Sequence, residues 1–124
     1  MHILVSQSSG VPLYEQIVEQ VIRAILAGEL AAGDALPSLR ALAADLRVSL
    51  ITTTRAYAEL TAAGWIVSVP GRGAFVCELD PARIRAGALE RVRADLTRAV
   101  SLVRDGEHVT LTDLHHMLEE EWRR

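Results

Sequence analysis

Apolar residues recur every three to four positions in the first quarter of the chain, which is the spacing of one buried face on an α-helix. Pro12 precedes this run and is favoured at the first position of a helix. Gly28 follows the run and suits the left-handed residue that ends a helix. The pattern therefore predicts an amphipathic helix between these two residues. Its expected inner face is Leu13, Ile17, Val18, Val21, Ile22, Ile25 and Leu26.

A second, shorter helix is predicted beyond a connector that contains Gly33 and Pro37. Pro37 and Ser38 open this helix, which is expected to end near Arg47. Its expected inner face is Leu39, Leu42, Ala43 and Leu46.

A third helix is predicted from about Leu50 to Ala63, with Ser49 as its N-cap and Gly64 at its end. Three consecutive threonines, residues 52–54, lie near its start, although β-branched residues are poor helix formers. Their hydroxyls are easier to explain if this end of the helix faces a polar partner. The packing candidates are Ile51, Ala58, Leu60 and Ala63, with Tyr57 alongside.

Two short apolar runs, 65–69 and 74–76, flank the turn Pro70-Gly71-Arg72-Gly73 and predict a β-hairpin. Two short helices that are joined by a tight turn and followed by a hairpin are typical of a winged helix-turn-helix. We expect Trp65, like Tyr57, to belong to the core rather than to a stacking surface.

Two more helices are predicted in the last third of the chain. Asp80 and Pro81 suit the start of a long helix that Gly106 closes, and residues 110–113 resemble the capping box of a final helix. The long helix has one face rich in arginine and an apolar stripe of Ile84, Ala88, Val92, Leu96, Ala99, Val100 and Val103. The final helix carries Leu111, Leu114, Met117, Leu118 and Trp122.

These patterns predict a mostly α fold of the α+β class, with two parts. Residues 1–78 form a winged helix-turn-helix domain with a small hairpin wing, and residues 79–124 form a helical-hairpin tail. Half of the chain is hydrophobic but only 4% is aromatic, so Ala, Leu, Val and Ile must fill the core. That composition favours the packing of helices over a large sandwich.

The remaining composition points to a soluble, cytoplasmic protein. Cys77 is the single cysteine, so an intramolecular disulfide is excluded. The N-terminal residues have no basic start, sustained apolar run or cleavage-like site, and no stretch of about 18 apolar residues predicts a membrane span. We therefore expect no membrane partner.

The net charge of −3 argues against a nucleic-acid partner, because such proteins usually carry a basic footprint. The charge is unevenly distributed, however. Residues 38–73 contain four arginines against two acidic residues, and all thirteen cationic residues are arginine, whose fork matches phosphate and guanine. The alternative is that biased codon usage alone explains the missing lysines. A dimer would present this locally cationic stretch twice.

The stretch from Pro12 to Val76 resembles the GntR family of bacterial transcriptional regulators. Three pieces carry the resemblance, in order and at family-like spacing: Gly33-Asp34-x-Leu36-Pro37-Ser38-x-Arg40-x-Leu42-Ala43, Arg55-Ala56-Tyr57-x-x-Leu60 and Gly71-Arg72-Gly73-x-Phe75-Val76. The brief tail and the Arg-Ala-Tyr triplet resemble the YtrA-like subfamily, whose members carry a two-helix tail that dimerises. The resemblance implies a sequence-specific regulator, expected to be a repressor that binds double-stranded DNA on a palindromic operator as a homodimer.

The third helix is the expected recognition helix, because the major groove admits one α-helix and the first residues of that helix reach the base edges. Arg40 precedes it, where the resemblance implies a phosphate or guanine contact, and Arg72 lies between two glycines at the wing tip. The alternatives are that Arg40 is merely solvated and that the wing tip is an ordinary hairpin turn. The predicted DNA-contact residues are Ser38, Arg40, Ser49, Leu50, Thr52, Thr53, Arg55, Gly71, Arg72 and Gly73.

The pair Leu50-Ile51 departs from the family pattern, which often has Arg or Pro and then a polar residue. Thr53 also departs, because Val is common at that position. An apolar pair at the start of the recognition helix suits a thymine methyl group, which accepts apolar contact.

The tail is expected to hold two copies together and so to set the spacing of two half-sites. The alternative is that its apolar stripe packs only on its own last helix. The predicted dimer interface is Ile84, Ala88, Val92, Leu96, Val100, Val103, Leu114, Leu118 and Trp122.

Two alternatives to this function, an interaction module and an enzyme, differ in class. A winged helix can serve as a protein-interaction module without DNA, because fold does not determine function. We expect no enzyme and no cofactor, since no nucleophile–base arrangement or phosphate-binding loop occurs. His115, His116 and Glu119 are a weak metal candidate, because adjacent histidines point to different faces and more ligands are needed. A small-molecule effector, if one exists, would have to bind between domains or across the dimer.

Overall fold

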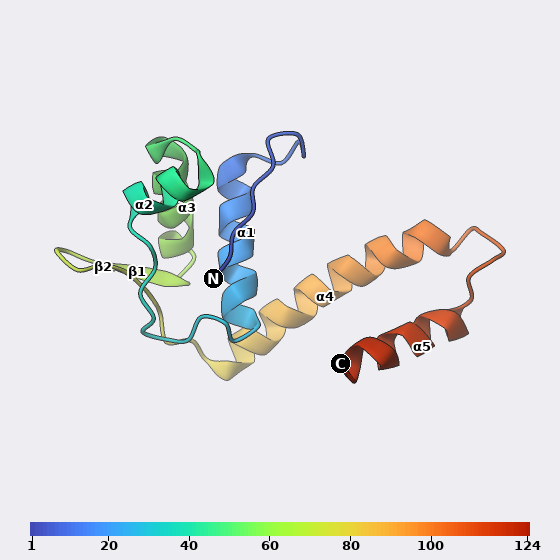
Figure 1. The fold of residues 1–124 in the computed structure, drawn as a ribbon. Coiled ribbons are helices and arrows are strands. Elements are labelled where there is room, and N and C mark those ends of the chain that lie inside the picture. Colours follow the sequence, from blue (N-terminus) through green and yellow to red (C-terminus); the bar gives the residue numbers. More distant parts are fainter. The chain divides into compact units, whose positions relative to one another are not determined.

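The first three helices form where the apolar spacing predicted them (Figure 1). The computed structural model describes residues 1–124, and in it α1 spans Leu13–Leu26, α2 spans Leu39–Leu46 and α3 spans Leu50–Ala62. Pro12 is the N-cap of α1, so the helix begins one residue later than predicted. The left-handed residue after α1 is Gly28, as expected, with φ 81°.

Two serines start the helices of the helix-turn-helix, and both predictions are confirmed. The Ser38 hydroxyl accepts a hydrogen bond from the Ala41 N–H at 3.1 Å, and the Ser49 hydroxyl accepts one from the Thr52 N–H at 3.2 Å. Each bond gives a side-chain partner to a backbone N–H in the first turn, where the helix supplies no i−4 carbonyl. Between the two helices Arg47 adopts a left-handed conformation with φ 56°, and it is the only non-glycine residue with positive φ.

The wing is an antiparallel hairpin of β1 (Ile66–Val69) and β2 (Gly73–Val76). Val69 pairs with Gly73, which leaves a three-residue loop at the tip. The connector before α2, expected to be irregular, also pairs with this sheet. Gly33 N–H donates to Val76 O at 2.8 Å, and Leu36 N–H donates to Ala74 O at 2.9 Å. The β2 strand is therefore hydrogen-bonded along both of its edges, to β1 on one side and to the connector on the other.

The core of this part of the chain is enclosed by α1, α3 and β1. Ile17, Val21, Leu60 and Ile66 are its largest fully buried apolar side chains. Residues 1–11, for which the apolar spacing predicted no element, contribute to the core through Ile3, which is also buried.

The buried face of α3 differs from the predicted one. Ile51, expected in the core, is 81% exposed, and Ala58 and Ala63 are exposed as well. The buried residues of α3 are instead Thr53, Ala56, Tyr57 and Leu60. These four follow the three-and-four spacing of one helix face, so the predicted helix was right and its inner face was wrong at three positions.

The two tail helices are α4 (Pro81–Val103) and α5 (Leu111–Trp122). Asp80 Oδ1 accepts a hydrogen bond from Ala82 N–H at 2.9 Å at the start of α4, as predicted. The predicted capping box at α5 is confirmed, and its hydrogen bonds from Thr110 lower the pKa of Asp113. No residue of either helix is buried. None of the helices combines the length and the apolar character that crossing a membrane requires.

The chain divides into two units, Met1–Ala86 and Gly87–Arg124. The division lies eight residues beyond the predicted boundary between residues 78 and 79, because the first turn of α4 packs on the first unit. The Arg83 guanidinium lies over the Trp65 ring, 4.5 Å from its centroid, and donates a hydrogen bond to Ala63 O. Trp65 is buried, as predicted, with this cation on its face.

The conformation of Arg47 generates a prediction. Arg47→Gly is expected to raise the free energy of unfolding by about 0.5–1 kcal/mol, because a left-handed backbone costs an L side chain more than glycine loses in freedom. Urea unfolding at a fixed protein concentration measures the change. Arg47→Ala is the matched control, since it removes the same guanidinium but keeps Cβ. An equal gain from Arg47→Ala would show that backbone strain is not the cause.

Candidate nucleic-acid interface

Two buried side chains of α3 attach that helix to the start of α2. Thr53 Oγ1 donates a hydrogen bond to Leu39 O at 3.1 Å, and Tyr57 Oη donates one to Pro37 O at 2.7 Å. Burial raises the pKa of Tyr57 to about 12, so its hydroxyl stays protonated and remains a donor at neutral pH. The two bonds place the first turn of α2 beside the middle of α3.

Thr53 was predicted to contact DNA, and this prediction is wrong. Its side chain is fully buried, and its hydroxyl also donates to Leu50 O at 3.1 Å. A hydroxyl that is enclosed in this way is unavailable to an outside partner. The signal that would have assigned it inward is its spacing from Ala56, Tyr57 and Leu60, the other buried residues of α3. The family preference for Val at this position is in line with an inward side chain.

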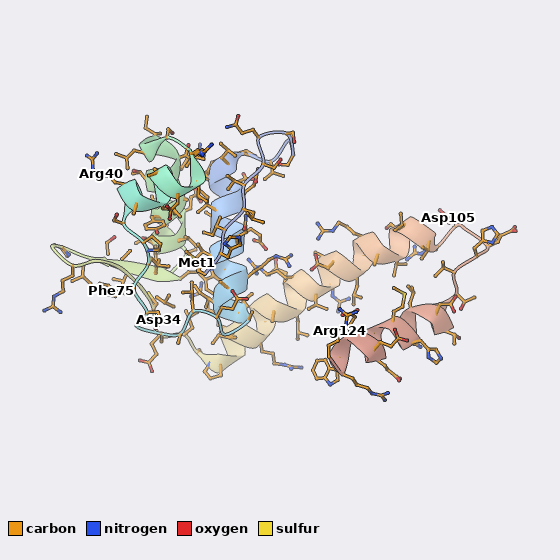
Figure 2. The ribbon with its side chains drawn as sticks, viewed as in Figure 1. Met1, Asp34, Arg40, Phe75, Asp105 and Arg124 are labelled. Atoms are coloured by element: carbon orange, nitrogen blue, oxygen red, sulfur yellow. The ribbon has the colours of Figure 1, made fainter.

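A groove of about 900 Å³ lies between the start of α2, one flank of α3 and the wing. Four of the predicted contact residues line it: Ser38, Arg40, Gly71 and Gly73. Arg40 is exposed and projects from the first turn of α2 (Figure 2). The structure thus brings together residues from two segments that lie more than thirty positions apart in the sequence.

The flank of α3 that faces this groove was not among the predicted contacts. Thr54, Ala58 and Thr61 line the groove from the helix, and Ser68 and Pro70 line it from the wing. Thr54, Ala58 and Thr61 are spaced four and three residues apart, which is the period of one helix face. The recurrence of small and polar residues at this spacing was the sequence signal that could have predicted this exposed flank.

The wing tip carries Arg72 between two glycines. Gly71 and Gly73 have φ values of 76° and 108°, a region that L side chains rarely adopt, and a Cβ at either one would meet no atom within 4 Å. The glycines are therefore required by the backbone conformation rather than by crowding. Arg72 itself is exposed.

The N-cap and the first two turns of α3 hold the remaining predicted contacts, and two of their hydroxyls form a hydrogen bond with each other. Ser49 Oγ and Thr52 Oγ1 lie 2.9 Å apart in a hydrogen bond, in addition to the cap that Ser49 provides. Leu50 is 38% exposed. Arg55 is exposed, and its guanidinium stacks on the Tyr14 ring at 3.8 Å from the centroid.

The segment that forms α2, α3 and the wing is rich in exposed arginine. The four arginines of residues 38–73, which are Arg40, Arg47, Arg55 and Arg72, are all exposed. None of them forms a salt bridge with a carboxylate of the chain, in contrast to Arg23, Arg98, Arg123 and Arg124. Arg40 lines the groove and Arg72 lies at the wing tip, and exposed guanidiniums with no ionic partner in the chain suit a polyanion.

The three helices, the paired hairpin and the groove between them define a winged helix-turn-helix protein. Residues 13–76 match the family described as bacterial regulatory proteins, gntR family. The chain therefore belongs to the GntR family, and it is a YtrA-like member.

Similar proteins support this assignment over most of the chain. The HTH-type transcriptional repressor YtrA of Bacillus subtilis is 32% identical over 120 residues, which is 95% of this chain and 90% of that protein. A GntR family transcriptional regulator from Listeria monocytogenes has a TM-score of 0.73 and 29% identity over 91% of this chain and 97% of its own. The structure of AraR(DBD) in complex with operator ORX1 has a TM-score of 0.56 and 28% identity over 62% of this chain and 100% of its own.

The inward orientation of Thr53 is testable. Thr53→Val keeps the shape of the side chain but removes the hydroxyl that donates to Leu39 O and Leu50 O, so the free energy of unfolding is expected to fall by about 1 kcal/mol. The affinity of the folded protein for duplex DNA, measured by fluorescence anisotropy, should change by less than about twofold. Thr54→Val is the matched control, because its hydroxyl lines the groove, and we expect it to weaken DNA binding with little effect on unfolding. If Thr53→Val lost DNA binding while fully folded, the inward assignment would be wrong.

Proposed function

We propose that the protein is a cytoplasmic transcriptional repressor that binds a palindromic DNA operator as a homodimer. The observation that carries the proposal is the set of four exposed arginines of residues 38–73 that form no salt bridge, one of which, Arg40, lines the groove of α2, α3 and the wing. The AraR(DBD) structure, which is a complex with operator DNA, supports a DNA partner for a domain of this fold. The name of the Bacillus subtilis relative, a transcriptional repressor, supports the direction of regulation.

The proposed contacts are of three kinds, to the phosphate backbone, to the minor groove and to the base edges of the major groove. Ser38 and Arg40 at the start of α2 suit the phosphate backbone, because a helix N-terminus and a guanidinium both favour an anion. Arg72 suits a narrow minor groove, where the potential is most negative. The first turn of α3 then faces the base edges of the major groove. The phosphate contacts contribute most of the affinity, and the base contacts discriminate among sequences.

A single unit has few cations for a DNA-binding protein, so the proposal needs two copies. Two units on one duplex raise the effective concentration of the second contact and so strengthen binding without any new interaction. The tail is the proposed means of association. Val92 and Leu96, both predicted interface residues, are 51% and 48% exposed in the single chain.

The alternative that the stripe is covered by its own last helix finds no support, since no residue of α4 or α5 is buried. Leu89, which the predicted stripe omitted, belongs to the same face. It lines one groove of α4 together with Val92, Leu96 and Val100, and it is 51% exposed. Covering such a face is favourable at about 25 cal/mol per Å² of apolar surface.

The contribution of the wing is testable by the salt dependence of binding. Arg72→Ala is expected to weaken binding to all duplexes and to lower the slope of log K against log salt by about one per wing, because one cation that displaces counterions from the duplex is lost. Filter binding across a range of salt concentrations measures both. Arg85→Ala is the matched control, since it removes the same charge from an exposed position outside the proposed interface. A slope that is unchanged by Arg72→Ala would remove the wing from the proposal.

The tail interface is testable by sedimentation. Val92→Arg places a charge in the middle of the apolar face and is expected to yield monomers by sedimentation velocity, because a buried unpaired charge strongly opposes association. Ala94→Arg is the control, since Ala94 is exposed and lies outside the predicted apolar stripe. Should Val92→Arg sediment as the parent protein does, the copies associate through another surface.

A further inference from the structure

The first turn of α3 exposes an apolar side chain where a DNA-reading helix usually has hydrogen-bonding groups. Ile51 is 81% exposed, the highest value among the large hydrophobic residues of Met1–Ala86. It lies in the first turn of α3, between the exposed cap residue Ser49 and the exposed Thr54. Most of its surface is left uncovered by the chain and is available to a partner from outside.

The hydroxyls around Ile51 are less available to bases than the sequence suggested. Thr53 is buried and bonded to two carbonyls, while Ser49 and Thr52 are bonded to each other. Of the predicted contacts in this turn, Leu50 has only 38% of its surface exposed. The Thr53 hydroxyl and one of the two O–H donors of Ser49 and Thr52 are therefore used within the chain, and the most exposed apolar group of the first turn is the Ile51 side chain.

The edges of the base pairs offer one apolar group in the major groove, the C5 methyl of thymine. From this chemistry we propose that Ile51 determines part of the sequence specificity by packing against a thymine methyl in each half-site. The inference rests on the proposed function and adds the identity of one base and of the residue that recognises it. The small side chain of Ala58, exposed on the same helix, leaves space for α3 to approach the major groove of the DNA closely.

The arrangement favours this partner over an apolar surface of another protein. Arg55 is one turn further along α3 and exposed, and Arg40 and Arg72 lie on the same domain with no ionic partner in the chain. An apolar side chain on a domain with several exposed arginines is complementary to a DNA duplex, in which the thymine methyls are flanked by phosphates. A protein partner would instead require a contiguous apolar patch.

The test begins with the parent protein and a random-sequence duplex library. Selection yields the preferred duplex, in which each thymine is then replaced singly by deoxyuridine, which lacks only the methyl group. One position in each half-site is expected to lose about 3- to 10-fold in affinity, the size of one lost apolar contact. Replacing that thymine by 5-methylcytosine, which carries the same methyl, is expected to cost less than replacing it by cytosine.

The variants assign the effect to one side chain. Ile51→Ala should bind the thymine and deoxyuridine duplexes equally, Ile51→Val should retain most of the discrimination, and Leu50→Ala should retain all of it. Each variant is expected to unfold at the temperature of the parent protein, since the changed groups lie on the surface.

The outcomes separate this inference from the proposed function. If the parent protein selects no duplex at low salt, the proposed function fails. If it selects a duplex but no thymine-to-deoxyuridine change weakens binding, the proposed function stands and the role of Ile51 is refuted. Discrimination that is lost in Leu50→Ala and kept in Ile51→Ala also overturns the assignment. If Ile51→Ala alters only association with another protein, the side chain belongs to a protein interface.

Discussion

The arrangement of the proposed interface depends on the hydrogen bonds between α3 and the start of α2. Thr53 and Tyr57 point inward and bind the carbonyls of Leu39 and Pro37, on either side of the cap residue Ser38. Both donor residues are buried, so the bonds are shielded from competition with water, and breaking one would remove a contact between α3 and the start of α2. Through them the exposed Arg40 and the outer flank of α3 keep their positions around one groove.

The hydrogen bonds of Thr53 and Tyr57 also determine which groups of α3 remain available to a partner. The Thr53 hydroxyl, which fastens α3 to α2, is lost to recognition, and the hydrogen bond between the Ser49 and Thr52 hydroxyls uses one of their two O–H donors. The exposed surface of the first turn is therefore more apolar than its composition suggests, with Ile51 outermost. An overall acidic protein can still suit DNA under these conditions, because binding depends on local charge and shape rather than on the net charge of the chain.

The tail presents a different physical situation, since its two helices bury none of their own residues. Their apolar spacing was evident from the sequence because it extends over several turns, and the caps of α4 and α5 were evident because they are local patterns. The division between the units was harder to predict. Arg83 continues the packing of the first unit into α4 through contacts with Trp65 and Ala63, and these contacts join residues about twenty positions apart.

The sequence by itself determined the order of the elements, their caps, the wing turn and the family, because each depends on residues that are close together in the chain. Only the tertiary structure decided that Thr53 faces inward while Ile51 and Ala58 face outward, and that the connector at Gly33 pairs with β2. The inner face of a short, weakly amphipathic helix such as α3 is decided by what packs against it. That information lies in distant segments, so helix periodicity could not provide it.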